Sequence, residues 1–256
     1  MVSDDFRLRF PAVELILFDA VGTVLTPRRP VAEVYHEYGE RFGSQRTRNQ
    51  IRDRFHWALQ RNAGRAIQPS WEGRPVRVSP WLRANTNESR ELRRWHRIVA
   101  NVFDDVPDRA GELFFELWQH FAQAEAWEVH PDWSETRTTL QRLGLQVGMA
   151  SNFDQRLLHL AEELHPLKGL RHLFVSSRLG VSKPDPRFYQ AIERQTGFGG
   201  PSILLIGDDP LHDVIAPRQA GWQALWWSPN EQAVGMKNLP RLRRFSDLIR
   251  FSPCDE

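Results

Sequence analysis

Five short, largely apolar runs constrain the fold more than any other feature of this chain. They cover Glu14–Phe18, Leu145–Ala150, Leu173–Ser176, Ile203–Ile206 and Gln223–Trp227. Each run has the length of a buried strand, and after residue 131 helical patterns of about ten residues separate one run from the next. This alternation predicts right-handed βαβ units and a parallel sheet covered on both faces. We therefore expect an α/β fold with a doubly wound, Rossmann-like sheet.

Four segments after residue 131 have the spacing of helices. They are Trp133–Leu143, Gln155–Leu164, Pro186–Gln195 and Leu211–Ala220. Asp132 and Glu135 predict a capping box at the start of the first segment. Asp185 is expected to cap the helix that begins at Pro186. Pro217 should kink or shorten the last segment, because proline has no N–H to donate.

The chain between residues 27 and 127 has a different pattern, with apolar and aromatic residues at helical spacing and no strand pattern. The expected helices are Val31–Phe42, Asn49–Leu59, Ser89–Phe103 and Ala110–Phe121. We expect a helical-bundle cap at 27–127, inserted into a core domain made of 1–26 and 128–256. A Pro/Gly/Arg-rich segment at 62–87 is longer than most loops, and predicts either a mobile flap or an irregular wrap held by Trp71 and Trp81.

Charge and cysteine content exclude several classes of protein. The chain has 34 Lys+Arg against 32 Asp+Glu, a net charge of +2, so we expect neither nucleic acid nor membrane as a partner. No apolar run is long enough for a membrane-spanning helix. The N-terminal stretch does not have the pattern of a signal peptide, and Cys254 is the single cysteine, so we expect a cytoplasmic protein without internal disulfides.

Polar residues gather where the predicted strands end. They are Asp19, Ser151, Asn152, Asp208 and Asp209, with Asp213 about one turn further on. Ligands of open α/β sheets bind beyond the carboxyl ends of the strands, so these side chains are expected at one edge of the sheet. Lys183 follows the short strand and is one of only three lysines among the 34 basic residues. A lysine in such an arginine-rich chain suggests a position that needs a compact ammonium group.

Four motifs resemble those of the haloacid dehalogenase superfamily, in the same order and with matching spacing across about residues 13 to 227. They are FDAVGT at 18–23, ASN at 150–152, SKPDP at 182–186 and IGDDPLHD at 206–213. The helical insert is similar to the type-one cap of the branch that contains haloacid dehalogenases and phosphatases. The stretches FDAVGTVL and PVAEVYHEYGERFG further resemble the rhythmically expressed and domain-containing-3-like hydrolases of that branch.

The resemblance implies that Asp19 is the nucleophile and forms an aspartyl ester or aspartyl phosphate. It also implies a Mg²⁺ site formed by Asp19, Asp208 and the main-chain carbonyl of Val21. A cation is physically reasonable there, because two nearby carboxylates oppose each other's ionisation unless a positive charge neutralises them. Asp209 precedes a proline and is expected chiefly as a helix cap. Asp213 is expected to hold the metal's waters or the lysine.

The remaining motif residues imply a phosphate-binding pocket. Ser151 and the backbone N–H of Asn152 offer hydrogen-bond donors to a phosphoryl oxygen. Lys183 would neutralise both the nucleophile and the transferred group, so Ser151 and Lys183 join Asp19 as expected catalytic residues. Gly22 allows a ligand to approach the turn, and Thr23 is expected to order that turn by hydrogen bonding.

Val21 departs from the family pattern. Phosphatases of the superfamily carry a second aspartate at this position, which protonates the leaving group and then activates water. Three hypotheses remain open: a Mg²⁺-dependent phosphatase of a small phosphorylated metabolite with weakened acid–base catalysis, a metal-independent dehalogenase-like hydrolase, or a binding protein without useful turnover. His36 and His96 are candidates for a borrowed acid, although each has an ordinary packing or surface role as its alternative. The sequence indicates neither the substrate nor the oligomeric state.

Overall fold

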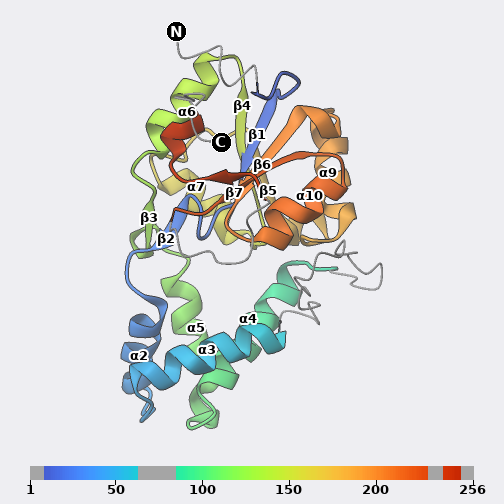
Figure 1. Ribbon diagram of the computed structural model, residues 1–256. Helices are drawn as coiled ribbons and strands as arrows, with labels where there is room; N and C mark the ends of the chain where they lie inside the picture. Colours follow the sequence, from blue (N-terminus) through green and yellow to red (C-terminus); the bar gives the residue numbers. More distant parts are fainter. Residues whose placement is uncertain (1–8, 63–84, 230–238, 249–256) are drawn as a thin grey trace.

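A six-stranded parallel sheet forms the centre of the molecule (Figure 1). The computed structural model describes residues 9–62, 85–229 and 239–248. The strand order is β5–β4–β1–β6–β7–β8, and every neighbouring pair is parallel. The strands are β1 (Leu15–Phe18), β4 (Gln146–Ser151), β5 (His172–Val175), β6 (Ile203–Gly207), β7 (Gln223–Trp227) and β8 (Arg241–Leu242). The predicted α/β class is confirmed, and all five predicted strands are present.

Helices cover both faces of this sheet, as the continuous apolar strands require. Along β1, Ile16 and Phe18 face one cluster and Leu15 and Leu17 face the other. The first cluster includes side chains from α6 (Trp133–Arg142) and α7 (Arg156–Glu163). The second includes side chains from α9 (Pro186–Thr196) and α10 (Ala216–Gln219). The two hydrophobic layers fix the carboxyl ends of the strands at one edge.

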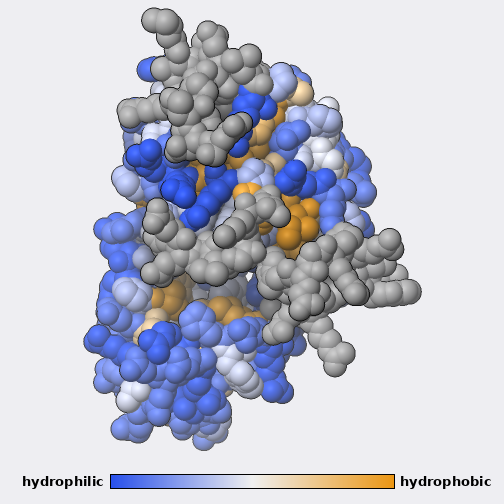
Figure 2. Space-filling model, in the orientation of Figure 1, coloured by the Kyte–Doolittle hydropathy of each residue, from blue (hydrophilic) through white to orange (hydrophobic). Residues whose placement is uncertain are grey.

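Four further helices pack around a hydrophobic cluster of their own and lie beyond that edge of the sheet (Figure 1). They are α2 (Val31–Arg41), α3 (Arg48–Asn62), α4 (Glu88–Val102) and α5 (Ala110–His120), with a short 3₁₀ turn at Pro107–Arg109. We call them the helical part. Figure 2 shows a mostly hydrophilic surface over it. All four correspond to predicted helices. Residues 63–84, which include Trp71 and Trp81, lie outside the described residues.

A short antiparallel pair joins the helical part to the sheet. β2 (Leu25–Pro27) pairs with β3 (Trp127–Val129), so the chain enters and leaves the helical part side by side. A 3₁₀ turn at Ala124–Ala126 precedes β3. Arg28 adds hydrogen bonds from its Nε to the Glu125 carbonyl (3.0 Å) and from its Nη2 to the Trp127 carbonyl (3.3 Å). This pair was not predicted, since each strand is only three residues long.

Two local predictions are wrong. Asp132 has helical backbone angles and makes no side-chain capping bond, so the expected capping box is absent at α6. The single helix predicted at Leu211–Ala220 is instead a π-helical turn (Pro210–Ile215) followed by α10. Pro217 lies at the start of α10, where its missing N–H interrupts the regular hydrogen-bond pattern.

The remaining described elements are α8 (Ser176–Leu179) and 3₁₀ turns at Gly200–Ser202 and Phe245–Leu248. Within the described residues, no helix combines the length and apolar character that crossing a bilayer needs.

Candidate active site

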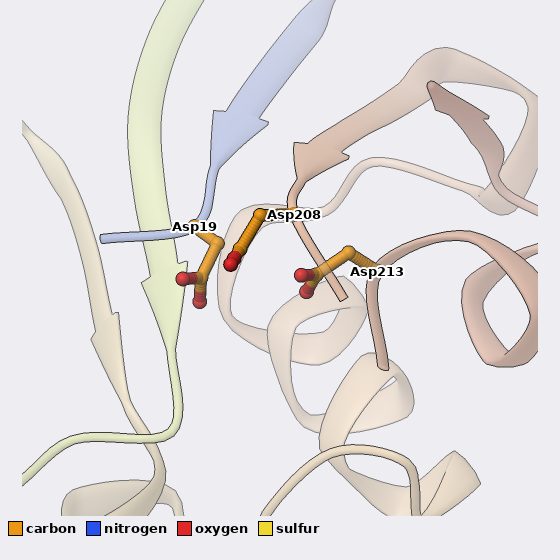
Figure 3. Close-up of side chains that lie close together, drawn as sticks. All are labelled: Asp19, Asp208 and Asp213. Atoms are coloured by element: carbon orange, nitrogen blue, oxygen red, sulfur yellow. The ribbon is translucent and has the colours of Figure 1, made fainter. Parts of the chain in front are cut away.

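Three carboxylates converge at the edge where β1 and β6 end (Figure 3). Asp19 follows β1, Asp208 follows β6, and Asp213 comes from the π-helical turn after β6. One carboxylate oxygen from each lies within 4.8 Å of the others. Asp19 and Asp213 are buried, at 8% and 1% exposure, while Asp208 reaches solvent at the rim. The sequence-predicted convergence of Asp19 and Asp208 is therefore present in the fold.

Two glycines make room for these carboxylates. Gly22 has a φ of +92°, and a Cβ at this position would overlap with Asp208 Oδ2. A Cβ on Gly207 would overlap with the carboxyl group of Asp213. Thr23, next to Gly22, directs its hydroxyl to Asp208 Oδ1 at 3.5 Å. The turn after Asp19 thus lies directly against Asp208.

Lys183 neutralises the buried side of the cluster. Its Nζ donates hydrogen bonds to Asp19 Oδ1 and Asp213 Oδ1, both at 2.6 Å, and to the Ala150 carbonyl at 3.0 Å. The residue is only 3% exposed. Burial alone would lower the pKa of Lys183, but the charges and hydrogen bonds of Asp19 and Asp213 raise it above its ordinary value. The ammonium therefore stays charged at neutral pH.

Asn152 fixes the backbone from which Lys183 extends. Its carboxamide donates from Nδ2 to the Lys183 carbonyl (2.9 Å), and its Oδ1 accepts from the Lys183 N–H (2.8 Å). Ser151, the preceding residue, ends β4 in register with Val175 and is 3% exposed. Sequence reasoning assigned only the backbone N–H of Asn152 to the site and missed this two-point contact of the side chain.

Asp209 and Asp213 form a chain of hydrogen bonds that leads to Lys183. Asp209 caps the π-helical turn, because its Oδ1 accepts from the N–H groups of Leu211 and His212, both at 2.8 Å. Burial opposes ionisation of Asp209, but hydrogen bonds and charge from His212 outweigh it and lower the pKa of Asp209 to about 2. The N–H of Asp209 donates to Asp213 Oδ2 at 3.0 Å, which leaves Asp213 Oδ1 for Lys183.

The donor set fits a hard divalent cation. Partial burial, and then the negative charges of Asp19 and Asp213, raise the pKa of Asp208 to about 7. Lys183 contacts Asp19 and Asp213 from the buried side, so additional positive charge near Asp208 would relieve the remaining repulsion. Carboxylate oxygens are ligands that Mg²⁺ prefers.

The comparisons with known proteins agree with this geometry. Residues 13–221 match the family model of the haloacid dehalogenase-like hydrolases. The chain belongs to this family. It is 29% identical to haloacid dehalogenase-like hydrolase domain-containing protein 3 of Danio rerio, with 84% of each chain covered. It is 25% identical to the rhythmically expressed gene 2 protein of Drosophila melanogaster, over 82% of this chain and 81% of that protein. Both belong to the group that the sequence motifs resembled.

Two further comparisons bear on chemistry and on fold. A phosphoserine phosphatase of Thermus thermophilus is 26% identical over 57% of this chain and 61% of its own length. The HAD hydrolase YfnB of Bacillus subtilis, solved bound to magnesium, superposes with a TM-score of 0.62 at 15% identity. That match covers 92% of this chain and 96% of YfnB, and at this identity it shows the shared fold alone.

In this HAD-like hydrolase the side chain of Val21 is part of the hydrophobic packing. It is half-buried against the main hydrophobic cluster, two residues beyond Asp19. The two histidines considered as substitute acids have partners inside the helical part. His36 Nδ1 lies 3.4 Å from Glu40, and the His96 ring packs on Phe114 with 5.1 Å between centroids.

A buried ion pair that sequence reasoning missed lies just after Asn152. Arg156 donates from Nε and Nη2 to the two carboxylate oxygens of Asp154, each at 2.8 Å. The Arg156 guanidinium also stacks over the Trp118 ring of α5, 3.4 Å from its centroid. The pair links α7 to the helical part. Its only sequence signal was an acid and a base two residues apart at the start of a predicted helix.

Proposed function

We propose that this HAD-like hydrolase is a Mg²⁺-dependent phosphatase of a small phosphorylated metabolite. The observation that carries the proposal is the contact of the Lys183 ammonium with Asp19 Oδ1 at 2.6 Å, beside the exposed carboxylate of Asp208. This arrangement gives a nucleophilic carboxylate, a fixed positive charge and an oxygen-rich cation site within a few ångströms. The relative from Thermus thermophilus is a phosphoserine phosphatase, which supports the same reaction class.

In the proposed reaction a carboxylate oxygen of Asp19 attacks phosphorus, the P–O bond to the leaving group breaks, and an aspartyl phosphate forms. Water then attacks phosphorus and loses a proton to solvent as the bond between phosphorus and the Asp19 oxygen breaks, which releases inorganic phosphate and restores the Asp19 carboxylate. Lys183 offsets negative charge on Asp19 and on the phosphoryl oxygens. The Ser151 hydroxyl and the backbone N–H of Asn152 donate to the same oxygens. Gly22 and Thr23 form the turn over which the phosphoryl group lies.

The residues that would hold Mg²⁺ are Asp19, Asp208 and the main-chain carbonyl of Val21. When bound, the ion would supply positive charge that neutralises the phosphoryl group. Asp213 and Asp209 would position Lys183, because Asp213 binds the Lys183 ammonium and the Asp209 N–H orients Asp213.

Val21 limits the substrates on which this site can act quickly. A valine side chain can neither protonate a leaving group nor activate water. The proposed enzyme therefore favours phosphate esters whose leaving groups depart without a proton. The same residue favours the second candidate, a binding protein that keeps a phosphate pocket without useful turnover. A dehalogenase-like hydrolase without metal is the third, and it leaves the role of Asp208 unexplained.

We also propose that the chain divides into a core domain of residues 1–26 and 128–256 and a cap domain of 27–127. The β2–β3 pair, which lies at both boundaries, supports this division. The proposed location is the cytoplasm, on the ground that the chain has a single cysteine.

The function is tested with p-nitrophenyl phosphate and a panel of phosphorylated metabolites, each with Mg²⁺ and with a chelator. We expect turnover with Mg²⁺ in the parent and none in Asp19→Asn. Halide release from 2-chloropropionate without metal would favour the dehalogenase instead. Normal phosphate binding by parent and variant, with no turnover of any ester, would favour the binding protein.

A further inference from the structure

The N-terminal end of helix α4 is docked on the core next to the Lys183 loop. The backbone N–H of Thr86 donates to the Gly180 carbonyl at 3.1 Å, and Asn85 forms an antiparallel bridge with Val181. Asn85 Oδ1 also accepts from Arg187 at 3.0 Å. The helical part therefore contacts the core at a second place, far along the chain from the β2–β3 pair.

Glu88, in the first turn of α4, accepts hydrogen bonds from two core segments through one carboxylate. Its Oε1 accepts from the hydroxyl of Ser177 at 2.5 Å, and its Oε2 accepts from the backbone N–H of Gln155 at 3.2 Å. Arg178 adds a longer ion pair at 3.9 Å. The Glu88 side chain is two-thirds withdrawn from solvent, at 32% exposure, which strengthens these charged hydrogen bonds.

The two segments that Glu88 contacts adjoin the candidate catalytic residues. Gln155 follows Ser151 and Asn152 by a few residues, and Ser177 precedes Lys183 in the same way. The core itself ties these segments together, because the Phe153 carbonyl accepts from the hydroxyl of Ser176 (3.2 Å) and from the N–H of Ser177 (3.3 Å). Glu88 adds two charge-assisted hydrogen bonds from outside the core across the same junction.

We propose that Glu88 is a positioning residue that holds the Ser151 and Lys183 loops in register when α4 is seated on the core. The inference rests on the proposed function for its kinetic consequence, but its structural consequence stands independently. In this arrangement the helical part does more than cover the site. Its seating on residues 177–181 completes the alignment of the Lys183 ammonium with Asp19 and of the Ser151 hydroxyl with the phosphoryl group.

The first test compares Glu88→Ala with Glu112→Ala, which removes an exposed glutamate of α5 that pairs only with Arg109 among the described residues. Amide hydrogen exchange should become faster at residues 153–156 and 177–183 in Glu88→Ala alone. Charged hydrogen bonds of this kind lead us to expect a fall in kcat of about tenfold, with KM changed less. Glu88→Gln, which keeps an acceptor for Ser177, should recover part of the loss.

Unchanged exchange at both segments in a folded Glu88→Ala protein would overturn the proposal. This readout needs no turnover, so it separates failure of the positioning role from failure of the phosphatase function. Equal kinetic losses in Glu88→Ala and Glu88→Gln, with unchanged exchange, would likewise contradict it. Ser177→Ala removes the partner hydroxyl instead, and should reproduce the faster exchange if Glu88→Ala does not fold.

A second test asks whether α4 stays seated during turnover. Asn85 and Val181 face each other across the antiparallel bridge, and such pairs have the Cα separation that a disulfide needs. In a Cys254→Ser background, the oxidised Asn85→Cys/Val181→Cys protein should keep at least about half of the kcat of its reduced form, a loss within twofold. Loss of activity on oxidation that returns on reduction would show that the seated position of α4 does not complete an active site, and would overturn the proposal.

Discussion

The substitution Val21→Asp tests why this site should be a weak acid–base catalyst. The turn around Val21 is held by its backbone: the N–H groups of Val24 and Leu25 both donate to the Ala20 carbonyl, and the N–H of Gly22 donates to the Leu25 carbonyl. The side chain itself contributes only half-buried apolar packing. The substitution therefore changes the chemistry of one side chain and leaves the path of the turn in place.

The expected gain in kcat/KM follows from the contribution that a general acid makes to the rate. Positioned proton transfer contributes about 100- to 10,000-fold in rate. This range corresponds to about 3 to 5 kcal/mol of activation free energy. An alkyl ester should gain more than an aryl ester, because the poorer leaving group depends more on protonation. Placing a polar group where valine packs should lower the free energy of unfolding by about 1 to 3 kcal/mol.

The assay measures kcat/KM for p-nitrophenyl phosphate and for a simple alkyl phosphate, with Mg²⁺ present. Val21→Asn is the matched control, since it is polar and of similar size but cannot transfer the proton. The double variant Asp19→Asn/Val21→Asp should be inactive. If folded Val21→Asp protein gained nothing on either ester, or if Val21→Asn gained as much, our explanation of the departure at Val21 would be wrong.

Three further predictions concern the charges of the site. Lys183→Arg should lower kcat by about 100-fold or more, because a planar guanidinium cannot take the place of the buried ammonium. The control Lys168→Arg, at an exposed lysine, should leave kcat unchanged. Equal rates in the two variants would contradict the role of Lys183. Gly22→Ala should abolish Mg²⁺-dependent turnover, because the added Cβ would overlap with Asp208. Gly43 has a similar φ of +90° but open space around a Cβ, so Gly43→Ala should only lower the free energy of unfolding, by about 1 kcal/mol. Equal activities of the two variants would contradict the close approach of Gly22 to Asp208. The pKa of Asp208 is raised to about 7 from the ordinary 3.8, so between these pH values the folded protein binds more protons than the unfolded chain. The melting temperature without metal should therefore fall as pH rises through this range. Asp208→Asn should flatten this dependence of melting temperature on pH.

Five of the six strands could be predicted because they are largely buried, whereas β8, with two residues, was not predicted. Segments such as Ile203–Ile206 are largely apolar runs, and each ends within one residue of the end of the observed strand. The convergence of Asp19 and Asp208 followed from that geometry together with the family motifs. The capping role of Asp209 was also readable, since a cap and the proline after it are adjacent in sequence.

Contacts between distant segments could not be predicted where neither the parallel sheet nor the family motifs bring the residues together. The β2–β3 pair joins Leu25 to Val129, and strands of three residues carry no periodicity. The carboxamide of Asn152 and the carboxylate of Glu88 each bind partners that only the folded chain brings near them. The Asp132 capping box failed for the opposite reason. Its pattern was local and complete, but the backbone enters α6 already in a helical conformation.

The central claim is that Asp19, Lys183 and a divalent ion at Asp208 together form a phosphoryl-transfer site. Fluoroberyllate, a mimic of the phosphoryl group, tests it most directly when its binding is followed by ¹⁹F NMR. We expect bound signals in the parent protein only when Mg²⁺ is present, and none in Asp19→Asn under any condition. Bound signals that persist in excess chelator, or that survive the loss of the Asp19 carboxylate, would contradict the account.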